Sequence, residues 1–454
     1  MQLTGIPEHR VSRREADLSL VLVPVWVLLG TIGLALHGAD VGVAAVLTGM
    51  GVLQLAFGVW VFWTHGGRQI TAAGVYSMSG AMFVGFATIY YAQWHGSAVP
   101  RVLHLAMVLC YFSHVAMYAL FWRTSYPAEQ AAARAYATQQ VTAWLGKTGL
   151  VLMGTAVAAR LAGIEVVIIS SMAFVSVVLF VCASFNHPGG PAGRFWYLFA
   201  AVIGFILYFE IFFSGYGRLN LATLCIVFAA AACRSFRHRS AKLITLAALP
   251  GMLLMFGAIR ETFIQGLYPE YDDTAHNGFE SVVEPFFTFG QVIEGIGGGT
   301  IDYGYGSTFV ATLFLEVPRA WWEGKPIGFG AVLIQVLFEK GTYAEGASLS
   351  ALSAGEWYFN FGVAGIVAMV LVLGPAIRWL DGVLHRVVTR PLGTRGDSLA
   401  LAAALVAVVG MSDLMWVGTF TYNERAGTRL LVILAIALLG TGVLRRRVRA
   451  LAGR

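Results

Sequence analysis

The sequence predicts an all-α polytopic membrane protein with about twelve transmembrane helices, as its hydropathy, its low charge and its recurring apolar segments indicate. Of the 454 residues, 58% are hydrophobic and only 12% are charged, and the mean hydropathy is +0.72. A soluble domain carries about 25% charged residues. Because so small a share leaves too little polar surface to coat a globule of this length, the composition excludes a cytosolic enzyme, a DNA-binding protein and a disordered protein.

The predicted spans follow from the length of the apolar segments. A membrane-spanning helix needs roughly 20 consecutive, mostly apolar residues. Segments of this kind lie at 18–36, 41–63, 70–93, 102–122, 142–160, 164–184, 195–213, 219–233, 241–258, 357–379, 398–420 and 428–444.

The basic residues predict the orientation. If the N-terminus is cytoplasmic, where Arg10, Arg13 and Arg14 precede the first span, most of the 30 Lys and Arg residues also fall on the cytoplasmic side. This excess is the usual pattern of membrane proteins. We therefore predict that both termini are cytoplasmic. The pI of about 9.2 then reflects this pattern, and we expect no nucleic-acid partner.

The long segment between the ninth and tenth spans predicts a large extracytoplasmic loop. The chain divides into 1–258 with nine helices, the acidic loop 259–356, and 357–454 with three helices and a basic cytoplasmic tail. Two apolar pieces of the loop, near 306–317 and 327–338, are too short to span a bilayer comfortably. We expect them to form interfacial helices or a re-entrant pair.

Ionisable residues in or beside the spans gather near the predicted outer ends, and the cytoplasmic half of the bundle is expected to be nearly free of them. Such groups are costly in a bilayer and usually face a cavity or a partner. Arg425 and Arg429 are four residues apart and so share a helix face, at the end where the helix dipole repels cations. Two interpretations stay open: an anion binds between them, or they pair with Glu424 or Asp413.

Glu356 comes directly before the tenth predicted span, and Asn360 follows on the same helix face. In one interpretation Glu356 is a carboxylate that accepts a proton from an attacking hydroxyl. In the other it is a glutamate in the first turn of a helix, where it complements the helix dipole.

The outer loop also carries two tryptophans beside two cations, Arg319, Trp321, Trp322 and Lys325. This stretch suits either a membrane-interface anchor or a platform for sugar and phosphate. Arg260, at the mouth of the ninth predicted span, is a further outer cation. The four cysteines lie in apolar stretches and the ten histidines are scattered, so we expect no metal site.

The loop and the start of the tenth span resemble a known family. The stretch Gly304-Tyr305-Gly306, then Val317-Pro318-Arg319 and Lys325-Pro326, then Gly355-Glu356-Trp357-Tyr358-Phe359-Asn360-Phe361-Gly362, is similar to bacterial oligosaccharide repeat unit polymerases. These are the Wzy-type polymerases of O-antigen, capsule and exopolysaccharide. The local resemblance covers roughly 60 residues, and the arrangement of many spans with one large late loop extends it loosely to the whole chain.

The resemblance implies a GT-C-like membrane glycosyltransferase in the bacterial plasma (inner) membrane. Such an enzyme would transfer the growing glycan from undecaprenyl diphosphate to the next lipid-linked repeat unit at the outer face. It would use neither a cofactor nor a metal. Its expected partners are the undecaprenyl diphosphate-linked oligosaccharide, the lipid bilayer, and the chain-length regulator and flippase of the same pathway.

The expected roles divide into three groups. Glu356 and Arg319 are expected to be catalytic. The cations of the outer face are expected to bind the diphosphate, namely Arg260, Lys325, Arg425 and Arg429. Polar and aromatic residues are expected to position the sugars, namely Tyr358, Asn360, Trp321, Trp322 and Asp413.

Two other functions fit the same architecture. An O-antigen ligase uses the same donor but passes the glycan to another acceptor, and a multi-pass transporter or flippase can also have twelve spans with both ends inside. The charged rim and the single asymmetric loop favour the polymerase over a carrier, since carriers often show repeats and midplane polar sites.

Overall fold

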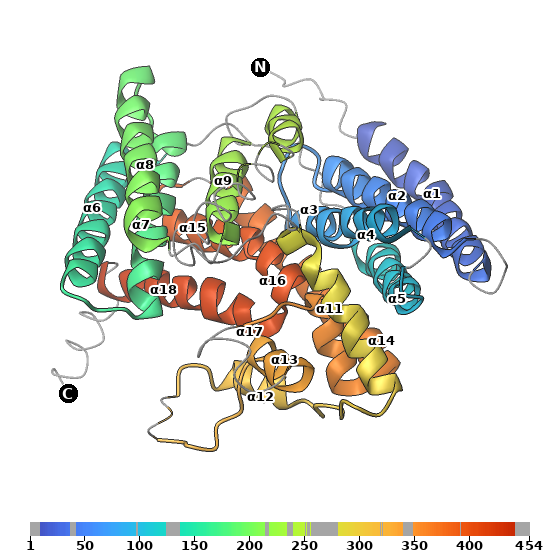
Figure 1. The fold of residues 1–454 in the computed structure, drawn as a ribbon. Coiled ribbons are helices and arrows are strands. Elements are labelled where there is room, and N and C mark those ends of the chain that lie inside the picture. The colour runs from blue at the N-terminus through green and yellow to red at the C-terminus, as the bar shows by residue number, and fades with distance from the viewer. Residues whose placement is uncertain are drawn as a thin grey trace, which may run out of the picture.

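A computed structural model describes residues 10–36, 42–96, 99–123, 137–213, 218–233, 239–249, 251, 255, 280–317, 319, 321–338, 348–390 and 392–440. Within these ranges the regular structure is helical and there is no strand. The prediction of an all-α chain is confirmed for this part of the protein (Figure 1).

The first group of helices lies on one side of the molecule (Figure 1). In it α2 packs against the continuous helix that α3, η2 and α4 form together, and α1 and α5 flank them. Gly51 and Gly85 allow close approach, because a Cβ on either residue would lie 2.8 Å from backbone of the opposite helix. The helices are α1 (Arg10–Ala35), α2 (Val43–Thr64), α3 (Ala72–Gly80), η2 (Ala81–Phe86), α4 (Ala87–His95), α5 (Val102–Met117) and η4 (Tyr118–Trp122).

A second group stands on the opposite side, where α7 packs between α6 and α8 (Figure 1). Much of α8 is exposed although it is strongly apolar, as expected for a helix that faces lipid. The helices of this group are α6 (Gln139–Leu161), α7 (Val167–Asn186) and α8 (Pro191–Phe212). Helix α9 (Arg218–Ala232) lies against α7 and α15, and a further helix over Ser240–Leu249 brings Lys242 to the end of α2.

The C-terminal helices join the two groups. Helix α14 packs against α5, and α18 packs against α7, with α15 and α16 between them. The helices are α11 (Glu280–Gly297), α12 (Ser307–Leu313), α13 (Phe329–Leu337), α14 (Leu352–Thr389), α15 (Arg395–Val409), α16 (Met411–Val417), α17 (Thr419–Tyr422), η5 (Asn423–Gly427) and α18 (Thr428–Gly440).

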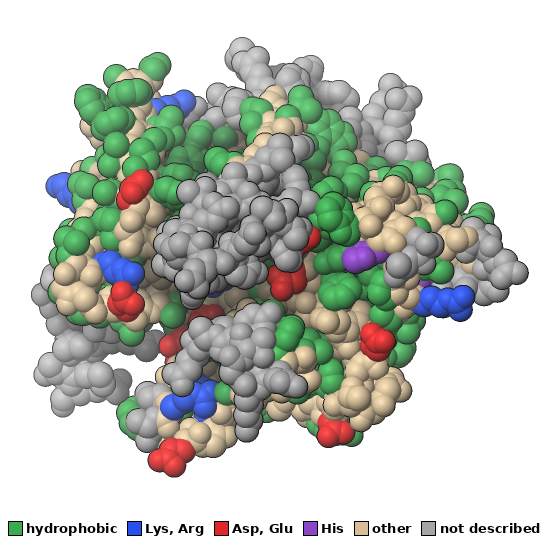
Figure 2. Space-filling model, viewed as in Figure 1, with side chains coloured by type: hydrophobic (Ala, Val, Ile, Leu, Met, Phe, Trp, Pro, Cys, Tyr) green, Lys and Arg blue, Asp and Glu red, His purple; other side chains and the backbone are tan. Residues whose placement is uncertain are grey.

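Eight segments of the described chain are long and apolar enough to cross a membrane, and they coincide with eight of the twelve predicted spans. The predicted spans 18–36, 219–233, 241–258 and 428–444 correspond to shorter apolar helices. Hydrophobic side chains cover much of the described surface, and charged ones form isolated spots (Figure 2). These features are those of a multi-pass membrane protein. The number twelve, the GT-C-like architecture and the orientation stay predictions.

The large loop differs from the prediction in one respect. The two apolar pieces form the short helices α12 and α13, as expected, but an additional helix of 18 residues, α11, precedes them. Pro285 and the acidic residues of α11 hide it from a search for apolar segments. It packs against α4, α5 and α14, so this part of the loop belongs to the helical bundle.

Candidate active site

The carboxylate of Glu356 is fully buried, and it binds the start of another helix. The backbone N–H of Thr419 donates to Glu356 Oε2 at 2.6 Å, and the Thr419 hydroxyl lies 2.9 Å from both carboxylate oxygens. Thr419 begins α17, which continues without a break through η5 and α18. A carboxylate at the N-terminus of this long helix complements its dipole.

The helix is interrupted between α16 and α17, which leaves room for the carboxylate. Gly418 separates α16 from α17 with φ +104, a conformation that favours glycine. A Cβ on Gly418 would collide with the Glu356 carboxylate. Of the two interpretations of Glu356, the one that places it in the first turn of its own helix is wrong, because α14 begins at Leu352 and its first turn holds no acid. The helix whose dipole it complements is α17.

Asn360 connects Glu356 to the loop that precedes α14. Its Nδ2 donates to the Glu356 carbonyl and to the Thr308 hydroxyl, both at 2.8 Å, and its Oδ1 accepts from the Gly306 N–H at 2.8 Å. Asn360 is fully buried, so these bonds are shielded from competing water. They fix the start of α12 against α14.

A second contact holds α12 against the helix that begins at Thr419. Asn423 Nδ2 donates to the Thr312 carbonyl at 2.9 Å, and the hydroxyls of Thr312 and Thr419 lie 3.5 Å apart. Helices α12, α14 and α17 therefore meet around the Glu356 carboxylate, below the centre of Figure 1.

Arg425 and Asp413 form a buried ion pair. Arg425 Nη1 donates to Asp413 Oδ1 at 2.6 Å, and the Asp413 side chain is inaccessible to solvent. This is one of the two interpretations left open by the sequence. Arg425 lies in the π-helical turn η5, about 9 Å along the helix from Thr419 at 1.5 Å per residue. Such turns occur frequently at functional sites.

Arg429 is buried without an acidic partner of its own. Its Nη2 donates to Asn220 Oδ1 at 2.6 Å, and its guanidinium lies 3.6 Å from the centre of the Phe174 ring. Within the described ranges, its Nε and Nη1 have no hydrogen-bond partner, and neither has Asp413 Oδ2. A buried guanidinium with two unused N–H groups is suited to binding an anion.

The cations of the loop are bound to backbone. Lys325 Nζ donates to the carbonyls of Leu315 and Val317 at 2.7 and 2.9 Å, after the end of α12. Arg319 Nη1 donates to the Lys325 carbonyl at 3.0 Å. These bonds fold the loop between α12 and α13, and the structure does not bring the two cations into contact with Glu356.

The remaining residues of the predicted site differ in their exposure and contacts. Trp321 is 83% exposed, whereas Trp322 packs edge-on against Phe314. Tyr358 is buried, and its ring packs against Phe289 of α11. Arg260 lies outside the described residues. Among the residues that are described, no three His, Cys, Asp or Glu side chains are grouped to hold a metal ion.

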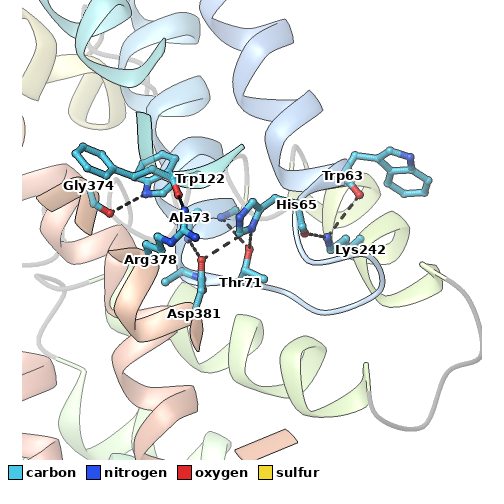
Figure 3. A network of polar contacts seen from close by, with 12 residues as sticks. Trp63, His65, Thr71, Ala73, Trp122, Lys242, Gly374, Arg378 and Asp381 are labelled. Atoms are coloured by element: carbon cyan, nitrogen blue, oxygen red, sulfur yellow. Dashed lines mark hydrogen bonds and ion pairs between the residues drawn. The ribbon is translucent and has the colours of Figure 1, made fainter. Parts of the chain in front are cut away.

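A second polar cluster lies at the other end of α14, and the sequence analysis did not predict it (Figure 3). Asp381 accepts from the backbone N–H groups of Ala72 and Ala73 at 2.6 and 3.2 Å. His65 Nδ1 lies 2.8 Å from the Thr71 hydroxyl and 3.8 Å from Asp381 Oδ2.

Lys242 completes this cluster, and its side chain is fully buried. Its Nζ donates to the carbonyls of His65 and Trp63 at 2.7 and 3.5 Å. We expected the cytoplasmic half of the bundle to be nearly free of ionisable groups. Lys242 and Asp381 are buried on the side that the sequence predicts to be cytoplasmic, so under that predicted orientation the expectation is wrong. Lys242 reaches His65 across 177 positions and Asp381 reaches Ala72 across 309, so no local pattern indicates the cluster.

The chain matches no protein family profile and no solved structure. It is similar to the O-antigen polymerases of Salmonella typhimurium and Salmonella typhi, each at 25% identity over 198 residues. The match covers 36% of this chain and 49% of each relative. The chain therefore spans about half the length of the curated relatives it matches, and the similarity is distant.

Proposed function

We propose that this protein is a polysaccharide polymerase that transfers a growing glycan from undecaprenyl diphosphate to the next lipid-linked repeat unit at the outer face of the plasma membrane. The observation that carries the proposal is the buried Glu356 carboxylate, held where α12, α14 and α17 meet. The similarity to two O-antigen polymerases supports the class of reaction.

The proposed reaction exchanges one bond at the anomeric carbon for another. A hydroxyl of the acceptor sugar attacks this carbon, and a new glycosidic C–O bond forms as the bond to the phosphate oxygen breaks. The acceptor proton passes to Glu356 acting as general base. The leaving undecaprenyl diphosphate keeps the bonding electron pair. The Thr419 hydroxyl, 2.9 Å from the carboxylate, occupies the place that we assign to the acceptor hydroxyl.

The departing diphosphate needs cations, because negative charge develops on its oxygen in the transition state. Arg429 is the best candidate, since two of its N–H groups are unused among the described residues. Arg425 is a second candidate, and Asp413 holds it in place. Arg319 and Arg260, in the proposed outer loop, stay further candidates for binding the diphosphate. Lys325 is less available, because its ammonium already donates to two carbonyls.

Deletion of the gene in its host, followed by gel and mass-spectrometric analysis of lipid-linked glycans, tests this function. We expect single lipid-linked repeat units to accumulate and polymer to disappear, and the wild-type gene to restore the polymer. Long polymer that stays on its lipid would instead identify a ligase. Repeat units trapped on the cytoplasmic leaflet would identify a flippase, and an unchanged glycan profile would contradict a role in glycan synthesis.

A further inference from the structure

Backbone strain in the described part of the chain is concentrated beside Glu356. Among the non-glycine residues described, Tyr305 and Leu352 have positive φ, at 46° and 63°. Leu352 begins the helix that carries Glu356. Such conformations are costly for residues with a Cβ and persist only where the surrounding structure imposes them.

The side chains of the two strained residues differ in their surroundings. Leu352 is fully buried, so its side chain is held by the surrounding helices. Tyr305 is 78% exposed, and packing does not account for the strain at this position. A strained residue whose aromatic ring is held out into the surroundings indicates a functional role.

The bonds that hold Tyr305 come from the helix of Glu356. On one side of it, the Gly304 N–H donates to the Phe359 carbonyl at 2.9 Å. On the other side, the Gly306 N–H donates to Asn360 Oδ1 at 2.8 Å. Since Asn360 also binds the Glu356 carbonyl, a single side chain fixes both the tyrosine turn and the residue proposed as general base.

A second tyrosine extends the surface. The rings of Tyr303 and Tyr305 lie 6.0 Å apart and are inclined by 61°. Tyr303 is 38% exposed, and its hydroxyl lies against Gly362, where α14 is interrupted. A Cβ on Gly362 would lie 2.9 Å from that hydroxyl, so the absence of a side chain at Gly362 leaves space for Tyr303.

We propose that Tyr303 and Tyr305 form a sugar-binding subsite that receives a ring of the lipid-linked repeat unit beside Glu356. The inference rests on the proposed function. A sugar presents C–H groups on its faces and hydroxyls at its edge, which suits an aromatic ring with a polar tip. Asp302, exposed beside Tyr303, provides an acceptor for sugar hydroxyls. Anchors at a membrane interface are Trp, Tyr, Lys and Arg side chains, whereas the charged residue beside Tyr303 is acidic.

The test uses the full-length protein in lipid nanodiscs and, as probe, the repeat-unit oligosaccharide released from its lipid diphosphate by mild acid. Saturation-transfer NMR measures its affinity. We expect Tyr305→Gly to weaken binding about tenfold, and Tyr305→Phe, which keeps the ring, to recover most of the affinity. Trp94→Ala, which removes an exposed tryptophan on α4, is the control and should bind the probe as the wild type does.

Folding is tested separately. Glycine adopts positive φ easily, so Tyr305→Gly should melt no lower than the wild type. Tyr305→Asn, which also tolerates this conformation, is the second ring-free variant. Wild-type affinity in both ring-free variants would overturn the subsite, as would a wild-type protein that does not bind the probe. The glycan profile of the deletion strain tests the proposed function independently, so the two failures are distinguishable.

Discussion

Each end of α14 carries a buried carboxylate, and the two ends differ in the structure that surrounds it. Glu356 near one end and Asp381 near the other are both buried, and both accept backbone N–H groups at the start of another helix. They are 25 residues apart on α14, which is interrupted between them at Gly362.

The difference lies in the regularity of the neighbouring structure. Around Asp381, α3 begins with an ordinary cap in which Thr71 accepts from the Gly74 N–H, and the cations there donate to carbonyls. Around Glu356 there are a broken helix, a strained tyrosine and, on the helix that begins at Thr419, an arginine with unused N–H groups. A buried carboxylate at a helix N-terminus therefore does not by itself indicate catalysis, and the strain and unused donors separate the two sites.

The largest expected effect comes from Glu356→Gln. The glutamine can keep both contacts with Thr419, because its oxygen accepts from the N–H and its amide donates to the hydroxyl. We therefore expect normal protein levels and a loss of polymer synthesis of about 10²–10⁴-fold, the usual contribution of a general base. Glycan gels of a complemented deletion strain measure it. Polymer at the wild-type level would remove Glu356 from the mechanism.

The Arg425–Asp413 pair should have the largest effect on stability. Arg425→Ala leaves the Asp413 carboxylate buried without its partner, which costs about 3–5 kcal/mol. A double variant with Asp413→Asn and Arg425→Gln removes both charges and should regain part of this loss. Thermal unfolding in detergent measures both variants. Equal melting temperatures for Arg425→Ala and the wild type would contradict a structural role for the pair.

Asp381→Asn should destabilise the fold without acting on the reaction. The amide group of the asparagine would face an N–H of Ala72 or Ala73 and leave it without an acceptor, at a cost of about 1–3 kcal/mol. We expect a lower melting temperature and, per folded molecule, unchanged polymer synthesis. A specific loss of activity at full stability would mean that the two ends of α14 do not differ in function.

The smallest expected effect near neutral pH is that of His65, which makes stability depend on pH. Burial, together with the nearby Lys242 ammonium, lowers the pKa of His65 from 6.5 to about 3, and Arg378 acts in the same direction. The unfolded chain therefore binds a proton below about pH 6.5 that the folded protein does not. Stability is complete above that pH and falls as the pH decreases towards 3. His65→Gln should show a smaller decrease, and melting curves with identical pH dependence would contradict this.

The sequence predicts what depends on local spacing and length. Apolar segments of sufficient length mark eight helices that are long and apolar enough to cross a membrane. The spacing of Glu356 and Asn360 places them on one helix face, where Asn360 binds the Glu356 carbonyl. The pairing of Arg425 with Asp413 was one of two open alternatives, since the two residues are 12 positions apart.

The features that the sequence does not predict depend on contacts between distant segments. Thr419 reaches Glu356 across 63 positions, and Ala72 reaches Asp381 across 309. The predicted span 398–420 contains Gly418 but gives no sign that the helix is broken there, because the reason for the break is the carboxylate of another helix. Only the fold brings such partners together.

The contact between Glu356 and Thr419 also has a consequence for biosynthesis. Thr419 leaves the ribosome 63 residues after Glu356, a delay of roughly 3–13 s at about 5–20 residues per second. During this interval the carboxylate has no helix N-terminus to bind. Because α14 is interrupted at Gly362, the apolar stretch that follows can enter the bilayer while Glu356 stays at the aqueous boundary. The contact between Glu356 and Thr419 is therefore formed only after the last helices have been synthesised.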